Sequence, residues 1–166
     1  MITIDIEPLT QDAFAPFGDV LAIGLGDAVP INQGRCTRHH NLSQPDILNG
    51  STGISLFQSE LQTLPYVLTM MERHPLGSQA FVPMCDAGFL VIVAPDEGGR
   101  PALPRAFMTA AFQGVSYHRN IWHGVLTPLS GSGMFCVIDR ISQQDTGGEN
   151  LEEFTFGTPY HVIGNA

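Results

Sequence analysis

The sequence contains no lysine: all seven basic residues are arginine, against 16 acidic residues, so the formal net charge is −9. Without a lysine amine the chain cannot form a Schiff base with a carbonyl substrate or anchor pyridoxal phosphate. A P-loop is excluded as well, because its phosphate contacts depend on a lysine. The excess of acid and the lack of a basic run also make nucleic acid and anionic membrane surfaces poor partners.

Cysteines and long apolar runs are scarce too. The three cysteines, Cys36, Cys85 and Cys136, are odd in number and far apart. This spacing predicts free thiols in a reducing compartment, which favours a cytoplasmic protein. The longest apolar runs fall far short of the ~20 residues that span a bilayer. Residues 1–5 lack the basic and apolar parts of a secretory signal.

The composition is that of a compact protein, with 43% hydrophobic and only 14% charged residues in a chain of 166. That length supports one sizeable core, so a single domain over residues 1–166 is expected. A short helix is predicted after Thr10, a good N-cap residue, and before Pro16. No stretch keeps a 3.6-residue period for three turns, and short extended segments closed by turn residues dominate.

Strands are expected over 3–7, 19–23, 53–58, 66–73, 79–84, 88–94, 105–109, 121–126 and 134–141. Segments 95–104 and 142–150 are rich in Gly, Pro and acid and are predicted to be surface loops. Together these features predict an all-β fold, either a barrel or a jelly roll.

The first candidate site lies at the end of the strand expected over 66–73. Side chains alternate along a strand, so Glu72 and His74 share one face while Arg73 takes the other. The turn at 75–78 lets the chain return and bring Gln79 close to Glu72 and His74. A carboxylate, an imidazole and an amide at one point can hold a divalent cation or a polar substrate. The alternative is that Glu72 only pairs with an arginine at a barrel rim.

The second candidate site is the segment 114–124, where His118, Arg119, Asn120 and His123 lie close to the only tryptophan. A turn at 118–120 would put His118 at a barrel mouth and His123 on the following strand. Small-molecule sites form at such mouths. The alternative is an aromatic hairpin with polar tips.

A third histidine cluster, in 35–40, is a weaker candidate. His39 and His40 are consecutive and point to opposite faces if extended, so at most one enters a site together with Arg38. Arg35 and His39 are expected at the surface. The remaining histidine, His161, lies in a tail expected either to cover a barrel edge or to contact a second subunit.

The first two segments resemble the metal-binding motifs of the cupins. The cupin motif H-x-H-x4-E and the motif P-x-G-x2-H are matched in position by Glu72, His74 and Gln79, and by His118, Asn120 and His123. The resemblance implies a cupin-type jelly-roll barrel, or double-stranded β-helix. It also implies a metal set of Glu72, His74, Gln79 and His123. Because only the two histidines His74 and His123 keep the ligand identity, a soft, exchangeable or absent metal is expected rather than a tight iron site.

Segments 72–83 and 117–123 are similar in detail to the bacterial ureidoglycolate lyases, formerly called ureidoglycolate hydrolases. The similarity extends to 8–20, to 31–34 with Arg38, and to the pair at 139–140. It implies cleavage of (S)-ureidoglycolate to glyoxylate and urea in allantoin breakdown. It further implies a homodimer of cupin barrels that uses nickel or another divalent metal.

That reaction needs a base for the substrate hydroxyl, an acid for the departing urea nitrogen and a cation for the carboxylate. The residues expected to supply them are His118 or His123 as base, Glu72 with His74 as acid or metal ligands, and Arg119 or Arg38 on the carboxylate. Asn32 and Gln79 are expected to hold the ureido group.

Two other functions stay open at this point. One is an amidohydrolase that releases ammonia and carbon dioxide instead of urea. The other is a non-catalytic cupin that binds a small organic acid. The gathering of titratable groups favours catalysis over binding alone.

Overall fold

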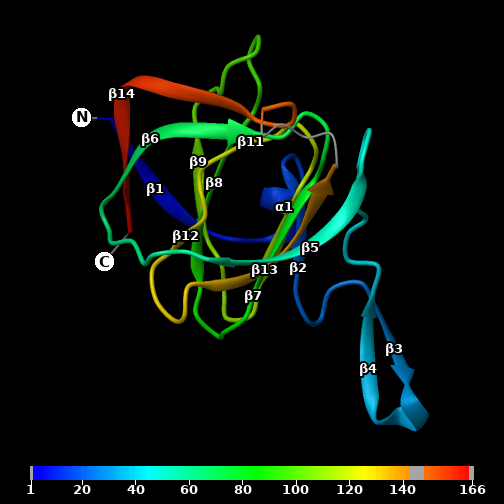
Figure 1. Ribbon diagram of the computed structural model, residues 1–166. Coiled ribbons are helices and arrows are strands. Elements are labelled where there is room, and N and C mark those ends of the chain that lie inside the picture. Colours follow the sequence, from blue (N-terminus) through cyan, green and yellow to red (C-terminus); the bar gives the residue numbers. More distant parts are fainter. Residues whose placement is uncertain (1, 143–147, 165–166) are drawn as a thin grey trace.

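The computed structural model describes residues 2–142 and 148–164, which form mostly β-strands (Figure 1). The helical part of this region is α1 (Gln11–Phe14) and a 3-10 helix (Asn32–Gly34). The hydroxyl of Thr10 accepts a hydrogen bond of 3.3 Å from the backbone N–H of Ala13, which caps α1 as expected. The prediction of an all-β fold with one or two short helices is confirmed.

Six strands close into a ring. They are β1 (Ile2–Pro8), β6 (Tyr66–Arg73), β8 (Phe89–Ala94), β9 (Arg105–Met108), β11 (Trp122–His123) and β14 (Glu152–Ile163). The order is β11-β6-β14-β1-β9-β8, and β8 pairs back with β11. A further short strand, β12 (Thr127–Pro128), pairs with β8. The carboxyl-terminal segment therefore completes the ring between β1 and β6, where His161 pairs with Thr3 and Val67.

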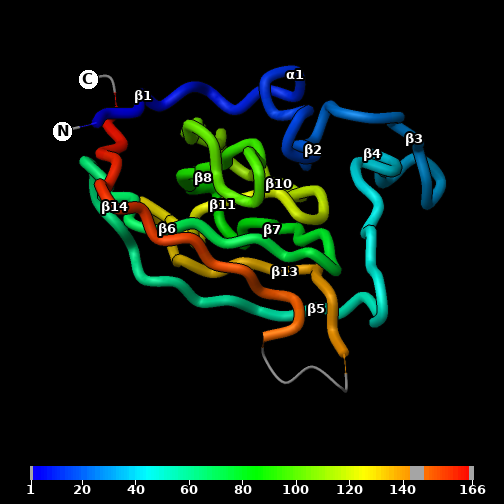
Figure 2. Tube along the Cα trace, turned by 90° about the horizontal axis from the view of Figure 1, so that it is seen from above, coloured from blue at the N-terminus to red at the C-terminus, as the bar shows by residue number. Residues whose placement is uncertain are grey.

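Five antiparallel strands form a second sheet. In sheet order they are β2 (Gly18–Leu21), β10 (Gly114–Tyr117), β7 (Gln79–Pro83), β13 (Met134–Ile141) and β5 (Ser51–Gln58). Figure 2 shows these strands following one another across the molecule.

A two-stranded ribbon projects from this body. It consists of β3 (Asp27–Ile31) and β4 (Cys36–His40), which pair only with each other. Figures 1 and 2 show it standing away from both sheets. Residues 27–40 are called the ribbon below.

The core has two parts, and β8 contributes alternate residues to each. Leu90, Ile92 and Ala94 join buried side chains from all six ring strands, so this cluster fills the ring. Val91 and Val93 join a second cluster, mainly aromatic and valine side chains from β9 and from the five-stranded sheet. This second cluster lies between the ring and the sheet, and it forms the floor on which the candidate site is built.

Some strand predictions were wrong. The strand expected over 121–126 is interrupted after two residues; the chain pairs with β8 again at Thr127, whose hydroxyl donates to the carbonyl of Val125 at 2.7 Å. Five observed strands were not predicted: β3, β4, β10, β12 and β14. The alternation of β14 is hidden by a register shift between Thr155 and Tyr160.

Candidate active site

His123 lies on β11, next to Trp122 in the chain but on the opposite side of the strand. Its Cα partner on β8 is Val93, which belongs to the core between the sheets, whereas Trp122 pairs with Ala94 in the ring core. His123 is therefore directed into the space between the ring and the five-stranded sheet. Its imidazole stacks on the ring of Tyr117, with centroids 4.4 Å apart and planes 3° from parallel.

The predicted alternation at the end of β6 is confirmed. Arg73 turns away from the site, and its guanidinium lies over the Trp122 ring at 4.4 Å. Glu72 takes the other side, where it is the Cα partner of His123. The ligand atoms of Glu72, His74 and His123 all lie within 4.8 Å of one another. These three residues are called the Glu-His-His cluster below.

Backbone carbonyls fix the orientation of both imidazoles. The Nδ1 of His74 lies 2.7 Å from the carbonyl oxygen of Asn150, and the Nδ1 of His123 lies 3.0 Å from that of Gly124. A carbonyl oxygen only accepts hydrogen bonds, so each Nδ1 must carry the hydrogen. Each neutral imidazole then presents the lone pair of its Nε2.

Those lone pairs are buried without a partner. The Nε2 atoms of His74 and His123 and the Oε1 of Gln79 have no hydrogen bond within the described part of the chain. Buried polar atoms are normally hydrogen-bonded, and leaving one unpaired costs about 1–3 kcal/mol. Three such acceptors in one place indicate a ligand that supplies donors or a positive charge.

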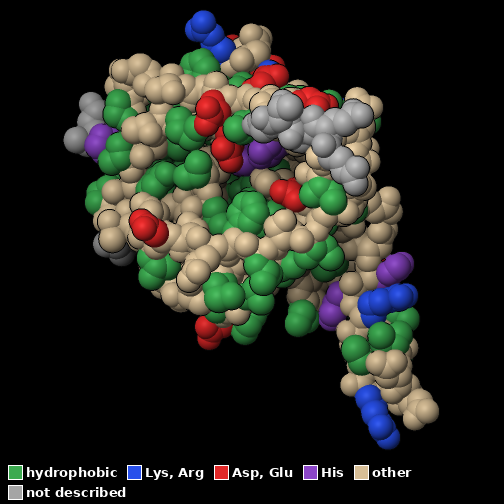
Figure 3. Space-filling view, in the orientation of Figure 1, with side chains coloured by type: hydrophobic (Ala, Val, Ile, Leu, Met, Phe, Trp, Pro, Cys, Tyr) green, Lys and Arg blue, Asp and Glu red, His purple; other side chains and the backbone are tan. Residues whose placement is uncertain are grey.

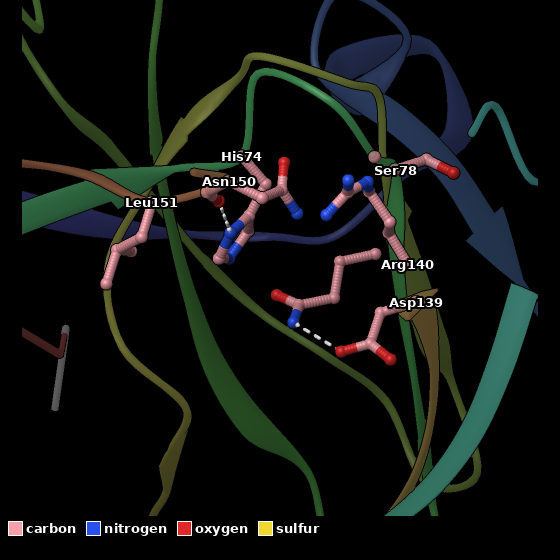
Figure 4. A pocket seen from close by; sticks show the side chains of 8 residues that line it. His74, Ser78, Asp139, Arg140, Asn150 and Leu151 are labelled. Carbon is pink, nitrogen blue, oxygen red and sulfur yellow. Dashed lines mark hydrogen bonds between the residues drawn. The ribbon is translucent and has the colours of Figure 1, made fainter. Parts of the chain in front are cut away.

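A cavity of about 240 Å³ opens beside His74. Its lining residues are His74, Gly77, Ser78, Gln79, Asp139, Arg140, Asn150 and Leu151. Figure 4 shows the side chains of His74, Asn150, Asp139 and Arg140 converging on this space. In the space-filling view, a histidine lies sunk between acidic side chains on the face formed by β6 and β14 (Figure 3).

The polar wall of the cavity opposite His74 comes from β7 and β13. The Nε2 of Gln79 donates to Asp139 at 3.3 Å, which leaves the Gln79 oxygen directed at the cavity side. Arg140 is buried and held in place: its guanidinium donates to the carbonyls of Leu48 and Asn49 at 2.9 and 2.6 Å. It also pairs with a carboxylate, that of Glu149, at 3.1 Å.

Burial dominates the electrostatics of the site. It lowers the pKa of His123 to about 3, assisted by the nearby charge of His74, so His123 is neutral at physiological pH. Burial raises the pKa of Glu72, an effect that the charge of His74 opposes and that of Glu153 reinforces. The pKa of Tyr117 is raised by burial and by the charge of Glu72, so its phenol keeps its proton.

The Glu-His-His cluster fits a divalent cation. Two imidazole nitrogens and a carboxylate oxygen are a donor set that first-row divalent metals accept, and Gln79 Oε1 is a further unpaired oxygen in the same cavity. The carbonyls behind each Nδ1 are the usual outer partners of metal-binding histidines. The Glu72 carboxylate and the Nε2 of His74 are also groups that can exchange protons with a substrate.

Other predicted residues of the second segment lie outside the cavity lining. His118 is exposed, with its Nε2 3.8 Å from a carboxylate oxygen of Asp19. The guanidinium of Arg119 donates to the carboxylate of Asp46 at 3.0 Å and to the carbonyl of Pro75 at 3.2 Å. The turn itself is close to the site, because the N–H of Asn120 donates to the carbonyl of His74 at 2.9 Å.

Asn32 and Arg38 are exposed on the ribbon and are not among the residues that line the cavity. Of the neighbouring histidines, His39 is half-buried and its Nδ1 accepts a hydrogen bond from the N–H of Gly24 at 3.2 Å, whereas His40 is exposed. The structure does not bring this third histidine cluster to the Glu-His-His cluster.

Several residues that build the site were not predicted to do so. Asn150 was expected in a surface loop, yet its carbonyl orients His74 and its side chain accepts from the N–H of Leu76 at 2.7 Å. Residues 143–147 of that expected loop lie outside the described residues. Asp139 was noted only within the pair at 139–140 that extends the family resemblance. The contact of Tyr117 with His123 was not predicted either.

Comparisons with known proteins identify the family of this chain. Among the described residues, no helix is long and apolar enough to cross a membrane. The sequence model of a family described as ureidoglycolate lyase matches residues 1–163.

Curated relatives carry that name as well. The ureidoglycolate lyase of Chelativorans sp. (strain BNC1) is 49% identical over 98% of this chain and 97% of its own. Ureidoglycolate lyase 2 of Rhizobium meliloti (strain 1021) is 48% identical over 98% of both chains. The ureidoglycolate lyase of Rhodobacter capsulatus is 50% identical over 96% of this chain and 97% of its own. The chain belongs to the ureidoglycolate lyase family.

Proposed function

We propose that the protein is a ureidoglycolate lyase that cleaves (S)-ureidoglycolate into glyoxylate and urea. The observation that carries this proposal is the convergence of Glu72, His74 and His123 beside one cavity, with two buried imidazole nitrogens that lack a partner within the described chain. Membership of the family supplies the substrate, and the polar cavity suits a small, charged molecule.

The reaction is an elimination. A base removes the proton of the substrate hydroxyl, and the O–H electrons form the carbonyl of glyoxylate. The bond between that carbon and the ureido nitrogen breaks, and its electrons take up a proton from an acid to give urea. Both proton transfers call for groups whose pKa lies near neutrality.

The Glu-His-His cluster supports this chemistry in two ways. With a divalent cation, nickel by the family resemblance, Glu72, His74 and His123 would hold it, together with Gln79. The cation would act as a Lewis acid on the oxygens of the substrate. Without a cation, His74 Nε2 is the proton acceptor, and Glu72, whose pKa is raised by burial, is the donor to the departing nitrogen.

His123 and His118 are weaker candidates for the base than the sequence predicted. A pKa of about 3 leaves His123 a fixed lone-pair donor that rarely accepts a proton. His118 is exposed and is not part of the cavity lining. We therefore assign His123 to holding the cation and stacking on Tyr117.

Substrate positioning falls to the opposite wall and to the turn. Gln79 Oε1 is placed to accept from a ureido N–H, with its amide nitrogen held by Asp139. Arg119 is the candidate for the substrate carboxylate, because it lies against the Pro75 turn next to His74. It would exchange the half-exposed carboxylate of Asp46 for that of the substrate.

We also propose that the chain works as a homodimer in the cytoplasm. The family resemblance supports the dimer. The three cysteines are free, as is usual in a reducing compartment.

The reaction is tested by incubating the purified chain with (S)-ureidoglycolate and measuring urea directly, before any urease is added, together with glyoxylate. Equal amounts of both products are expected. Ammonia without urea would make the protein an amidohydrolase. Saturable binding of glyoxylate without turnover would make it a binding protein.

The cation is tested separately, by calorimetric titration of nickel into chelator-treated protein. Glu72→Gln and His74→Ala are expected to weaken nickel binding, whereas His40→Ala on the ribbon is not. Full activity after exhaustive chelation and metal analysis would remove the cation from the proposal and leave the acid-base roles.

A further inference from the structure

The face of the five-stranded sheet that is turned away from the core has an apolar centre. Along β5, Phe57 packs inward on Phe81, whereas Ile54 and Leu56 point outward and are 76% and 66% exposed. The strand register extends this surface across β13 and β7 through Ile138, Cys136 and Val82. We call these outward residues, Ile54, Leu56, Val82, Cys136 and Ile138, the outer face. A sheet face that meets water normally carries polar side chains.

The chain covers only part of this side of the sheet. The segment after the ribbon crosses it near β2 and β10, where Leu42 and Pro45 line a cavity of about 250 Å³ with Ala80 and Ser116. This cover does not reach β5, since Ile54 and Leu56 keep most of their surface exposed. The apolar area near β5 is therefore left bare by the described chain.

The ribbon starts beside the outer face and has little support of its own. Most of its residues are exposed, and a two-stranded ribbon is only marginally stable alone in water. It carries Arg35 and Arg38, which make no ion pair within the described part of the chain. Figure 3 shows these basic and histidine side chains gathered on the projecting arm.

Unpaired acids lie at one end of the outer face. Glu60 follows β5 and Asp86 follows β7, both are exposed, and neither makes an ion pair with a described residue. The turn at 131–133 links the two places: Gly133 contacts Ser59, and Gly131 contacts Cys85. The ribbon contains two of the seven arginines but only one of the 16 acidic residues. The ribbon is therefore basic, whereas the rest of the chain is acidic and complementary to it in charge.

We propose that the outer face and the ribbon are one interaction surface, and that its occupant is a second copy of this chain. The bare areas around β5 of two copies pack against each other, and each ribbon reaches the other copy with Arg35 and Arg38 toward Glu60 and Asp86. One second copy supplies both the apolar face and the acids. This inference rests on the proposed homodimer and names its surface.

The test is sedimentation of the full chain over a range of concentrations. The double variant Ile54→Glu/Leu56→Glu should raise the dimer dissociation constant at least 100-fold and sediment as a monomer where the wild type is a dimer. Leu103→Glu is the matched control, because Leu103 is 68% exposed on the β8–β9 connection of the ring. It should keep the dimer. Arg35→Glu/Arg38→Glu should weaken the dimer less, about tenfold, and remove part of its salt dependence.

Two results would overturn the proposed surface: a wild type that is monomeric at every concentration, or an Ile54→Glu/Leu56→Glu variant that stays dimeric. Circular dichroism melts identify a variant that merely fails to fold, and the arginine pair, which lies outside the core, then serves as the second probe. The mass is measured independently of turnover. A dimeric wild type that makes no urea therefore refutes the proposed function alone, and a monomeric wild type that makes urea refutes the interface alone.

Discussion

Histidines that follow an arginine occur in two regions of this protein, which differ in burial and in the partners of the imidazoles. His74 follows Arg73 at the end of β6, and His39 and His40 follow Arg38 on the ribbon. The first region is enclosed: His74 and His123 lie with ring centroids 5.3 Å apart, and their Nε2 atoms are buried and unpaired within the described chain. The second projects from the body, and His40 is exposed.

The difference shows what turns a histidine-rich segment into a site. Local sequence places a titratable group beside a cation in both regions. Only in the Glu-His-His cluster do two strands distant in the sequence, β6 and β11, pair in register and set Glu72 opposite His123. Convergence and burial then change the chemistry, as the low pKa of His123 shows.

The largest expected effect separates the two regions directly. His74→Ala removes an oriented Nε2 from the cavity and should lower kcat for urea formation by roughly 10²- to 10⁴-fold, the usual share of an acid-base or ligand group. His40→Ala on the ribbon should stay within about twofold. Steady-state kinetics on both variants, with matched circular dichroism, measure the difference. Equal losses of kcat in His74→Ala and His40→Ala would contradict the assignment of the active site to the Glu-His-His cluster rather than to the ribbon.

A second comparison concerns arginines. Arg119→Gln should lower kcat/KM by roughly 10- to 100-fold, mainly through KM, because a charged hydrogen bond to the carboxylate is worth about 1.5–3 kcal/mol. Arg35→Gln, assayed at a protein concentration where it keeps the wild-type mass, should leave KM unchanged. If KM is unchanged in Arg119→Gln as well, the carboxylate is bound by another group.

The third prediction tests how the enclosed region is held in shape. Asn150→Ala removes the acceptor for the Leu76 N–H and loosens the carbonyl that orients His74. Mutation of such an outer partner of a metal-binding histidine typically lowers metal affinity or activity 10- to 100-fold. A loss of about tenfold in nickel affinity or turnover is therefore expected. Asn150→Asp keeps the acceptor and should restore most of it. A variant with alanine that binds and turns over normally would show that His74 needs no such support.

Much of the fold was predictable because it depends on local patterns. Short alternating strands located most of both sheets, and alternation alone placed Arg73 away from Glu72. The ribbon was not predicted because neither face of its strands is buried. Its sequence therefore lacks the alternation of apolar and polar residues that marks a half-buried strand.

The site was predictable only in part, for a related reason. His74 and Gln79 are close in sequence and line one cavity after a tight turn, and Glu72 joins His74 in the Glu-His-His cluster. Asn150 reaches His74 across 76 residues of chain, a contact that no local pattern encodes. Arg38 and Asn32 were predicted from resemblance, and the fold of a single chain places them on the ribbon instead.

The smallest expected effect concerns stability, and it follows from the burial of His123. An ordinary histidine has a pKa near 6.5, whereas folding lowers that of His123 to about 3. Between these values the unfolded chain binds a proton that the folded chain does not, so the free energy of unfolding falls as the pH drops below 6.5. The slope from this residue approaches about 1.4 kcal/mol per pH unit.

Urea denaturation of chelator-treated protein at pH 7.5, 6 and 5 measures this slope. The variant His123→Phe keeps an aromatic ring against Tyr117 but has no titrating group at this position. Its free energy of unfolding should therefore depend less steeply on pH than that of the wild type. The difference in slope should correspond to the uptake of close to one proton on unfolding. All other titrating groups are common to both proteins and cancel in the difference. Identical slopes would mean that His123 takes up its proton as readily in the folded chain as in the unfolded one. The enclosed region would then have no electrostatic distinction from the ribbon, and its role would rest on geometry alone.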